Sequence, residues 1–165
     1  PSYSGQSILP KRASNNVRHF IVLVIVLLTG CASTENVPPT GTDFALDECP
    51  PFWNCVSTSS TTNYHAIEPI QLAEPLGEST WAAIKAEALK LPGASLNEAR
   101  YGYLNITCYS DGLGFPDYLE LLIDSDKRRL SVRSQSWLGL YDMGVNRQRV
   151  ERLRRELVKR GIAVD

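Results

Sequence analysis

The residues best suited to chemistry form a polar block in the last third of the chain. Arginine guanidinium groups are fork-shaped donors that bind phosphate and carboxylate groups, and hydroxyl and amide side chains add further hydrogen bonds. Such side chains gather here around a glycine-containing turn, namely Arg133, Ser134, Ser136, Asn146, Arg147 and Arg149. Free backbone N–H groups at the start of a following helix would also attract an anion. The block therefore predicts a candidate anion-binding site.

The same block also fits a purely structural role. Asp142 or Asn146 can cap the last helix, Gly144 permits a tight turn, and the arginines can form ion pairs. Residues 127–160 hold 11 basic and 3 acidic side chains, whereas residues 31–126 hold 3 basic and 14 acidic ones. This dipolar distribution can steer an anionic partner or can serve pairing within the molecule.

Patterns for catalysis and for metal binding are weak in this chain. Only His65 among the histidines lies beyond the first 30 residues, and the Walker loop, Gly-x-Ser-x-Gly and His-Glu-x-x-His motifs do not occur. A nucleophilic Cys108 activated by His65 would make a hydrolase, which is the alternative hypothesis. Paired carboxylates for catalysis could come from Asp111, Asp117 and Asp124. Each of them lies in or beside a predicted turn, where aspartate is expected to bond the backbone locally. No metal site and no cofactor is predicted.

The N-terminal segment, residues 1–30, has the layout of a signal peptide. Basic residues precede an apolar run from Phe20 to Leu28, which at about 14 Å of helix is too short to cross a bilayer. The tetrapeptide from Leu28 to Cys31 resembles the lipobox of bacterial lipoproteins, in which the leader is cut before an acylated cysteine. The resemblance implies lipidation at Cys31; an ordinary secreted leader with a chance cysteine is the alternative.

The residues after Cys31 bear on location and spacing. Ala32 and Ser33 follow the cysteine, whereas an aspartate there tends to retain lipoproteins in the inner membrane, so the resemblance implies the periplasmic face of the outer membrane. Residues 31–48 contain prolines, glycine and little apolar periodicity, which predicts a flexible tether. Packing of this stretch on the domain through Phe44 and Leu46 is the alternative.

The cysteines fit an oxidising compartment. Cys49 and Cys55 are separated by five residues and can close a small disulfide loop, worth about 2–3 kcal/mol. If Cys31 is acylated, Cys108 is left over in an apolar, strand-like run, where it would act as a small buried hydrophobic side chain.

The spacing of apolar residues predicts one α+β domain over residues 49–165, with an antiparallel sheet of about four strands packed against two helices. Helical spacing predicts one helix from Ser79, as its N-cap, to Leu91 and a second, basic helix near the C-terminus. In that second helix Val150, Leu153 and Leu157 form one apolar stripe, and Gly161 ends it. Strands are predicted from Ala66 to Leu72, Tyr101 to Tyr109, Phe115 to Ile123 and Arg128 to Trp137.

Length and composition exclude several classes of protein. A chain of 165 residues suits one domain, and 43% hydrophobic with 21% charged residues is unlike a disordered, collagen-like or polytopic membrane chain. The formal net charge of −1 gives no electrostatic footprint for nucleic acid.

Several of these residues together resemble a known family. The segments are Cys49-Pro50, Asn54-Cys55-Val56-Ser57, Arg133-Ser134 with Ser136, Leu138-Gly139 and the run from Asp142 to Glu151. They are similar to domain-of-unknown-function family 1499 of bacteria and plastids, over about residues 49–158. The resemblance implies no activity. We therefore expect a membrane-anchored bacterial lipoprotein whose domain is a non-enzymatic binding or assembly module of the cell envelope, with an anionic ligand or a protein as partner. An envelope hydrolase is the alternative.

Overall fold

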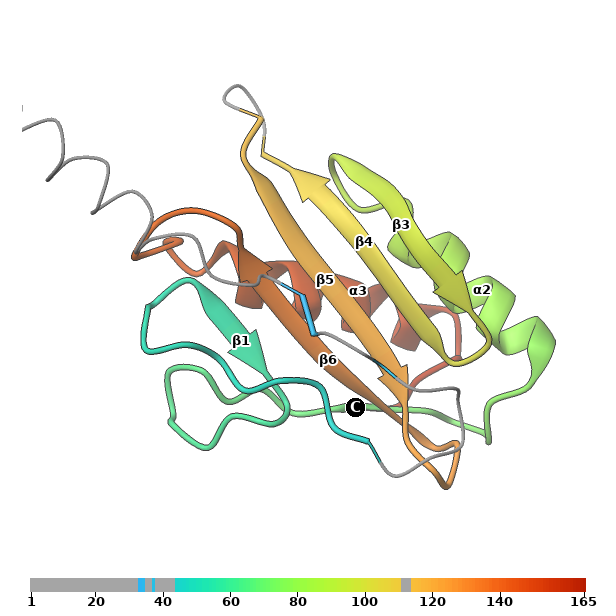
Figure 1. Ribbon diagram of the computed structural model, residues 1–165. Helices are drawn as coiled ribbons and strands as arrows, with labels where there is room; N and C mark the ends of the chain where they lie inside the picture. The colour runs from blue at the N-terminus through green and yellow to red at the C-terminus, as the bar shows by residue number, and fades with distance from the viewer. Residues whose placement is uncertain (1–32, 35–36, 38–43, 111–113) are drawn as a thin grey trace, which may run out of the picture.

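Three long neighbouring strands form the centre of the protein, whose computed structural model describes residues 33–34, 37, 44–110 and 114–165 (Figure 1). They are β4 (Tyr103–Tyr109), β5 (Pro116–Ile123) and β6 (Arg129–Ser136), each antiparallel to its neighbour. The expected antiparallel α+β fold is confirmed for the described part of the chain, but its sheet has six strands in place of about four.

The two strands that were not predicted, β1 (Cys55–Ser57) and β3 (Ala94–Arg100), are short or exposed, which explains why alternation did not reveal them. β3 pairs with β4 at one edge, and its side chains are mostly exposed, so it carries no apolar alternation. β1 and β2 (Ile70–Gln71) pair with different halves of β6. β2 covers two residues of the strand predicted from Ala66 to Leu72, and it begins directly after Pro69, which has no N–H to donate to a sheet.

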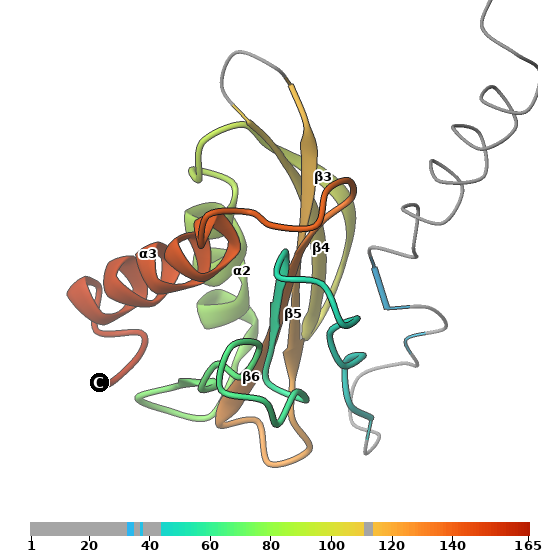
Figure 2. The ribbon, with the colours of Figure 1, turned by 90° about the vertical axis from the view of Figure 1, so that its left-hand side faces the viewer.

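Two helices cover one face of the sheet (Figure 2). They are α2 (Glu78–Ala88) and α3 (Val145–Lys159), and the predicted apolar stripe of α3 is buried. These helices pack on Leu104, Ile106 and Leu119 of the central strands, which are fully buried. Burying one such side chain contributes about 1.5–3 kcal/mol, so this layer stabilises the fold through many buried side chains.

Glycines stand at or beside the ends of both helices. Ser79 was predicted as the N-cap of α2, but the extended residue Gly77 holds that position and Ser79 lies inside the helix. After α2, Gly93 takes a φ of +66°, and a Cβ atom there would lie 2.1 Å from the Tyr109 carbonyl oxygen. A side chain at residue 93 would therefore collide with β4. The expected end of α3 is confirmed, because Gly161 is left-handed and Ile162 N bonds Leu157 O at 2.9 Å.

The opposite face of the sheet is covered in part by the N-terminal segment. Leu46 is 1% exposed and packs with Tyr103 and Leu122, and Thr34 is also buried. The packed domain therefore begins before the expected boundary at residue 49, as the alternative that relied on Leu46 anticipated; Phe44 stays exposed. The signal peptide, Cys31, Asp111 and part of the expected tether lie outside the described residues. In the described part of the chain no helix is long and apolar enough to span a membrane.

Candidate functional site

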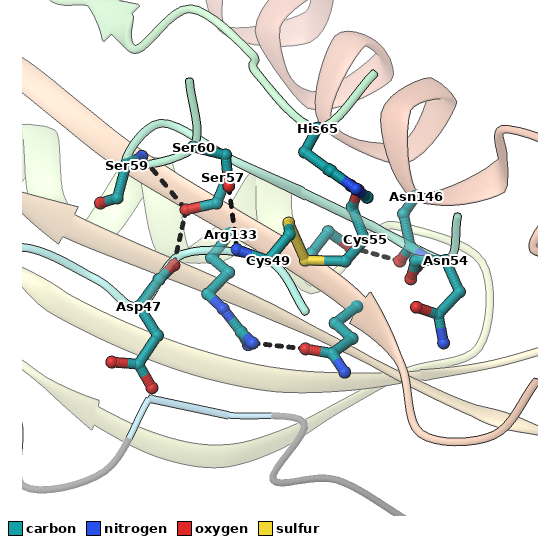
Figure 3. The surroundings of a disulfide bond; sticks show 12 residues. Asp47, Cys49, Asn54, Cys55, Ser57, Ser59, Ser60, His65, Arg133 and Asn146 are labelled. Atoms are coloured by element: carbon teal, nitrogen blue, oxygen red, sulfur yellow. Dashed lines mark hydrogen bonds between the residues drawn. A yellow bond between two sulfur atoms is a disulfide. The ribbon is translucent and has the colours of Figure 1, made fainter. Parts of the chain in front are cut away.

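Strand alternation divides the six residues predicted to bind an anion. Successive side chains of β6 point to opposite faces of the sheet, so Arg133 lies on the face away from the helices, whereas Ser134 and Ser136 face α3. The six side chains therefore do not converge on one place. Figure 3 shows this separation, with Arg133 beside the disulfide and Asn146 beside Asn54.

Four of the six residues meet between β6 and α3. The fully buried Asn146 accepts hydrogen bonds from Ser134 Oγ at 2.7 Å and from Arg149 Nη1 at 2.6 Å. Its amide nitrogen donates to Ser136 Oγ at 2.9 Å. Arg149 also reaches Asp117 Oδ2 at 2.6 Å in an ion pair that is about nine-tenths buried. Asp117 was predicted as a turn residue, and its ion pair with the helix requires the tertiary fold.

Two further residues complete this polar network. Asn54, just before β1, donates to the carbonyl oxygens of Ser136 at 3.2 Å and Gly139 at 2.7 Å. The carboxylate of Asp142 accepts the backbone N–H groups of Gly144 and Asn146 at 2.8 and 2.9 Å. The N-cap of α3 is Gly144, so neither Asp142 nor Asn146 holds the expected cap position, although Asp142 still binds two N–H groups there from two residues upstream. Its charge lies where the sequence suggested that a bound anion could sit.

Arg147 lies apart both from Arg133 and from the polar network between β6 and α3. Its Nη2 donates at 2.8 Å to the carbonyl oxygens of both Tyr64 and Ala66, in the segment that leads into β2. Carbonyl groups carry no net charge, so the guanidinium charge of Arg147 is not neutralised by these contacts.

A groove lies between α3 and the segments 91–92 and 109–110. Its volume is about 640 Å³, and four arginines of the helix line it, namely Arg147, Arg149, Arg152 and Arg155. Leu91, Tyr109 and Ser110 are among the residues that also line it. Arg152 and Arg155 are exposed and form no ion pair with any residue that the structure describes. Glu151 is the acidic side chain of the lining, so the groove is strongly basic.

A family model of proteins of unknown function, DUF1499, matches residues 45–157, which include all six described strands, α2 and most of α3. The chain belongs to the DUF1499 family. No curated protein and no solved structure matches the chain. The match starts next to the buried Leu46, in agreement with a domain that begins before residue 49.

The two groups proposed for nucleophilic catalysis are separated in the DUF1499 domain. Cys108 lies on β4, whereas His65 bonds the carbonyl oxygen of Cys55 on β1 at 3.0 Å. β5 and β6 lie between these strands, which places them three strand spacings, or about 14 Å, apart. Cys108 is buried, and that burial raises its pKa, so the thiolate is disfavoured.

The cysteine pairing agrees with the expectation from spacing. Cys49 and Cys55 form a disulfide, and Cys108 is a free, buried thiol (Figure 3). Ser60 Oγ accepts the Cys49 N–H at 2.9 Å, which ties the disulfide loop to the serine-rich turn after β1. Within the described ranges, no group of three or more His, Cys, Asp or Glu side chains could hold a metal ion.

A second polar cluster lies on the face of the sheet away from the helices. Glu120 and Arg133 are both nearly fully buried and approach to 3.3 Å between Oε2 and Nη1. Arg133 also donates to Gln135, and Tyr103 donates to Glu120 at 3.0 Å. Burial, followed by the Glu120 charge, raises the pKa of the Tyr103 hydroxyl well above its usual range.

The N-terminal segment closes this second cluster. The Thr34 N–H lies 3.0 and 2.9 Å from the two carboxylate oxygens of Glu120. Sequence patterns gave one signal for this contact, because Glu120 stands between two leucines in an apolar strand and needs a polar partner there. Its partner could not be chosen from the sequence.

Proposed function

We propose that this protein is a lipoprotein acylated at Cys31 and held at the periplasmic face of the outer membrane, where its DUF1499 domain binds an anionic ligand. The leader and the lipobox-like tetrapeptide support the anchor. The basic groove on α3 supports an anionic ligand. The domain is then a non-enzymatic binding module of the cell envelope.

The single observation that carries the ligand proposal is the pair of exposed arginines, Arg152 and Arg155. They stand three residues apart and therefore share one side of α3. Neither forms an ion pair with a described residue, and both line the groove. Their guanidinium groups can bind a phosphate or carboxylate without first breaking an internal ion pair.

The groove also limits the kind of anion. Leu91 and Tyr109 add apolar surface beside the arginines. A ligand with an anionic head and an apolar part would fill both kinds of surface, whereas a small inorganic ion would use only the arginines. We therefore expect glycerophosphate esters that carry a short acyl chain to bind more tightly than inorganic phosphate.

Thermal melting with added anions tests this proposal. A ligand that binds only the folded state stabilises it by about 1.4 kcal/mol at ten times its dissociation constant, which raises the melting temperature by about 5 °C. Phosphate, sulfate and these glycerophosphate esters are titrated separately. We expect Arg152→Ala and Arg155→Ala each to weaken binding about tenfold, the scale of one charge-assisted hydrogen bond.

The matched control is Arg128→Ala. Arg128 is exposed in the turn before β6, lies outside the groove and carries the same charge, and its backbone N–H and carbonyl groups form hydrogen bonds that alanine keeps. If all three variants lost the same affinity, the effect would reflect net charge alone and the groove would not be the site. A wild-type melting temperature that none of the anions changes would contradict the proposal.

A further inference from the structure

Exposed hydrophobic side chains gather at one end of the domain. Among the described residues, thirteen large hydrophobic side chains are exposed. Eight of them lie in the loop 137–144, at Val145 where α3 begins, at Trp53, which bonds the loop, or at Tyr64, which bonds Trp53. We name this surface the aromatic rim. Met143 is 77% exposed and Trp53 is 60% exposed. Contiguous patches of this kind mark interaction surfaces in soluble domains.

The aromatic rim has a fixed backbone. The N–H of Trp53 donates to Leu140 O at 2.9 Å, and the N–H of Asp142 donates to Trp53 O at 3.1 Å. Tyr64 adds a hydroxyl bond to the same Trp53 carbonyl at 3.3 Å. The loop therefore holds its apolar side chains toward solvent, because its own backbone is bonded to the segment before β1. In Figure 1 the loop extends beyond the end of β6 before it returns to α3.

Charge around the aromatic rim favours a negatively charged partner. The rim loop contains one charged side chain, Asp142, whose carboxylate is turned to the backbone N–H groups that begin α3. Immediately beyond the rim, Arg147 and the groove arginines supply positive charge. Aromatic side chains bordered by arginines match the interface of an anionic bilayer, where tryptophan and tyrosine lie at headgroup level.

The docked N-terminal segment places the proposed anchor near this surface. Cys31 precedes Thr34 by three residues, which span at most about 11 Å of extended chain. Thr34 is bonded to Glu120, the partner of Arg133, and Trp137 follows Arg133 by four residues, or about 13 Å of strand. Because Thr34 is docked on the domain, an acyl group on Cys31 would stay close to the domain and within reach of the aromatic rim.

We propose that the aromatic rim docks on the surface of an anionic bilayer, with its exposed tryptophans at the lipid interface and the arginines of α3 beside the headgroups. This role is separate from the proposed binding of a ligand in the groove. The anchor contributes to it only by keeping the domain near the bilayer. Docking orients the domain, with the start of α3 toward the lipid.

The three tryptophans allow a direct test. Trp53 and Trp137 belong to the rim, whereas Trp81 of α2 is 5% exposed and serves as an internal reference. Full-length protein is bound to vesicles of phosphatidylethanolamine and phosphatidylglycerol, with or without brominated acyl chains. We expect bromine to roughly halve the fluorescence of the Trp81→Phe variant, because both of its tryptophans face lipid. The variant with Trp53→Phe and Trp137→Phe should lose almost none.

A pair of surface variants tests whether the rim causes the docking. In the Trp81→Phe background, Met143→Asp places a charge on the most exposed rim side chain and should abolish the quenching. The matched control is Val164→Asp, which places the same charge on a 44% exposed side chain near β2 and should leave quenching unchanged. Unchanged melting of both variants shows that they are folded.

The same measurements can overturn the proposal. If the rim tryptophans of vesicle-bound protein are not quenched by bromine and stay fully accessible to iodide, the rim does not face lipid. Protection from iodide without quenching by bromine would assign the rim to a second protein and would equally contradict bilayer docking. The groove experiment uses soluble anions and melting, so failure of one proposal is distinguishable from failure of the other.

Discussion

The polar network between β6 and α3 predicts a large loss of stability when Asn146 is replaced by alanine. This fully buried side chain lies within hydrogen-bond distance of five different residues, and because its amide has two N–H groups for three acceptors, four full hydrogen bonds form at a time. Two of the five partners are the charged side chains of Asp142 and Arg149. Its replacement loosens several elements at once, because the partners belong to β6, to α3 and to the segments before β1 and α3.

The size of this destabilisation depends on the hydrogen bonds that the partners of Asn146 retain in the variant. Hydrogen bonds contribute about 0.5–1.5 kcal/mol each, and more when one group is charged, so four of them amount to about 5 kcal/mol. Arg149 still reaches Asp117, Ser134 still bonds Tyr118 O, and Asp142 keeps its two backbone partners. The retained bonds offset about half of the loss. We expect the free energy of unfolding to fall by about 3 kcal/mol and the melting temperature by about 12 °C.

Thermal and urea unfolding of the purified variant measure this change. The control is Gln148→Ala, two residues further along α3, where an exposed side chain is removed from the same helix and the effect should stay within about 0.5 kcal/mol. If Asn146→Ala melts within about 2 °C of this control, the network does not hold the helix to the sheet, and our account of the buried hydrogen bonds is wrong.

Two further predictions concern the cysteines. With a leader that a general signal peptidase removes, Cys31→Ala should release the protein from membranes in a carbonate wash, because docking without an acyl anchor is reversible; mutant protein that stays with the washed membranes would argue against lipidation. The double variant Cys49→Ala and Cys55→Ala should lose about 2 kcal/mol of unfolding free energy, the value for a loop of about seven residues. Peptide mapping of the intact protein should find Cys108 unpaired, and Cys108 in the bridge would contradict the pairing.

The sequence by itself determined the parts of the fold that depend on local periodicity. The stripe of Val150, Leu153 and Leu157 specified both the helix and its buried side, because a spacing of three and four residues repeats on one face of a helix. Alternation in β4 likewise separated Leu104 and Ile106, which face the helices, from Tyr103, which faces the other way. The disulfide followed from a short spacing, since a loop of this length brings its own ends together.

Strand alternation also predicts that the residues of the candidate anion site cannot all lie on one face of the sheet. Arg133 and Ser134 are consecutive residues of a predicted strand, so their side chains had to lie on opposite faces. Residue type alone therefore grouped side chains that strand alternation separates. The basic groove could not be located in the same way, because Leu91 and Tyr109 reach it from other elements through the pairing of β3 with β4 and the packing of α2.

Only the tertiary structure decided the partners of buried polar groups. Glu120 and Arg133 are brought together by the register of β5 against β6, and Asp117 meets Arg149 only because α3 crosses that part of the sheet. Thr34 bonds a residue 86 positions away. Contacts of such long range depend on how whole elements pack, and a polar side chain that must be satisfied can accept many partners, so local residue types specify the need for a partner and the fold selects which one it is.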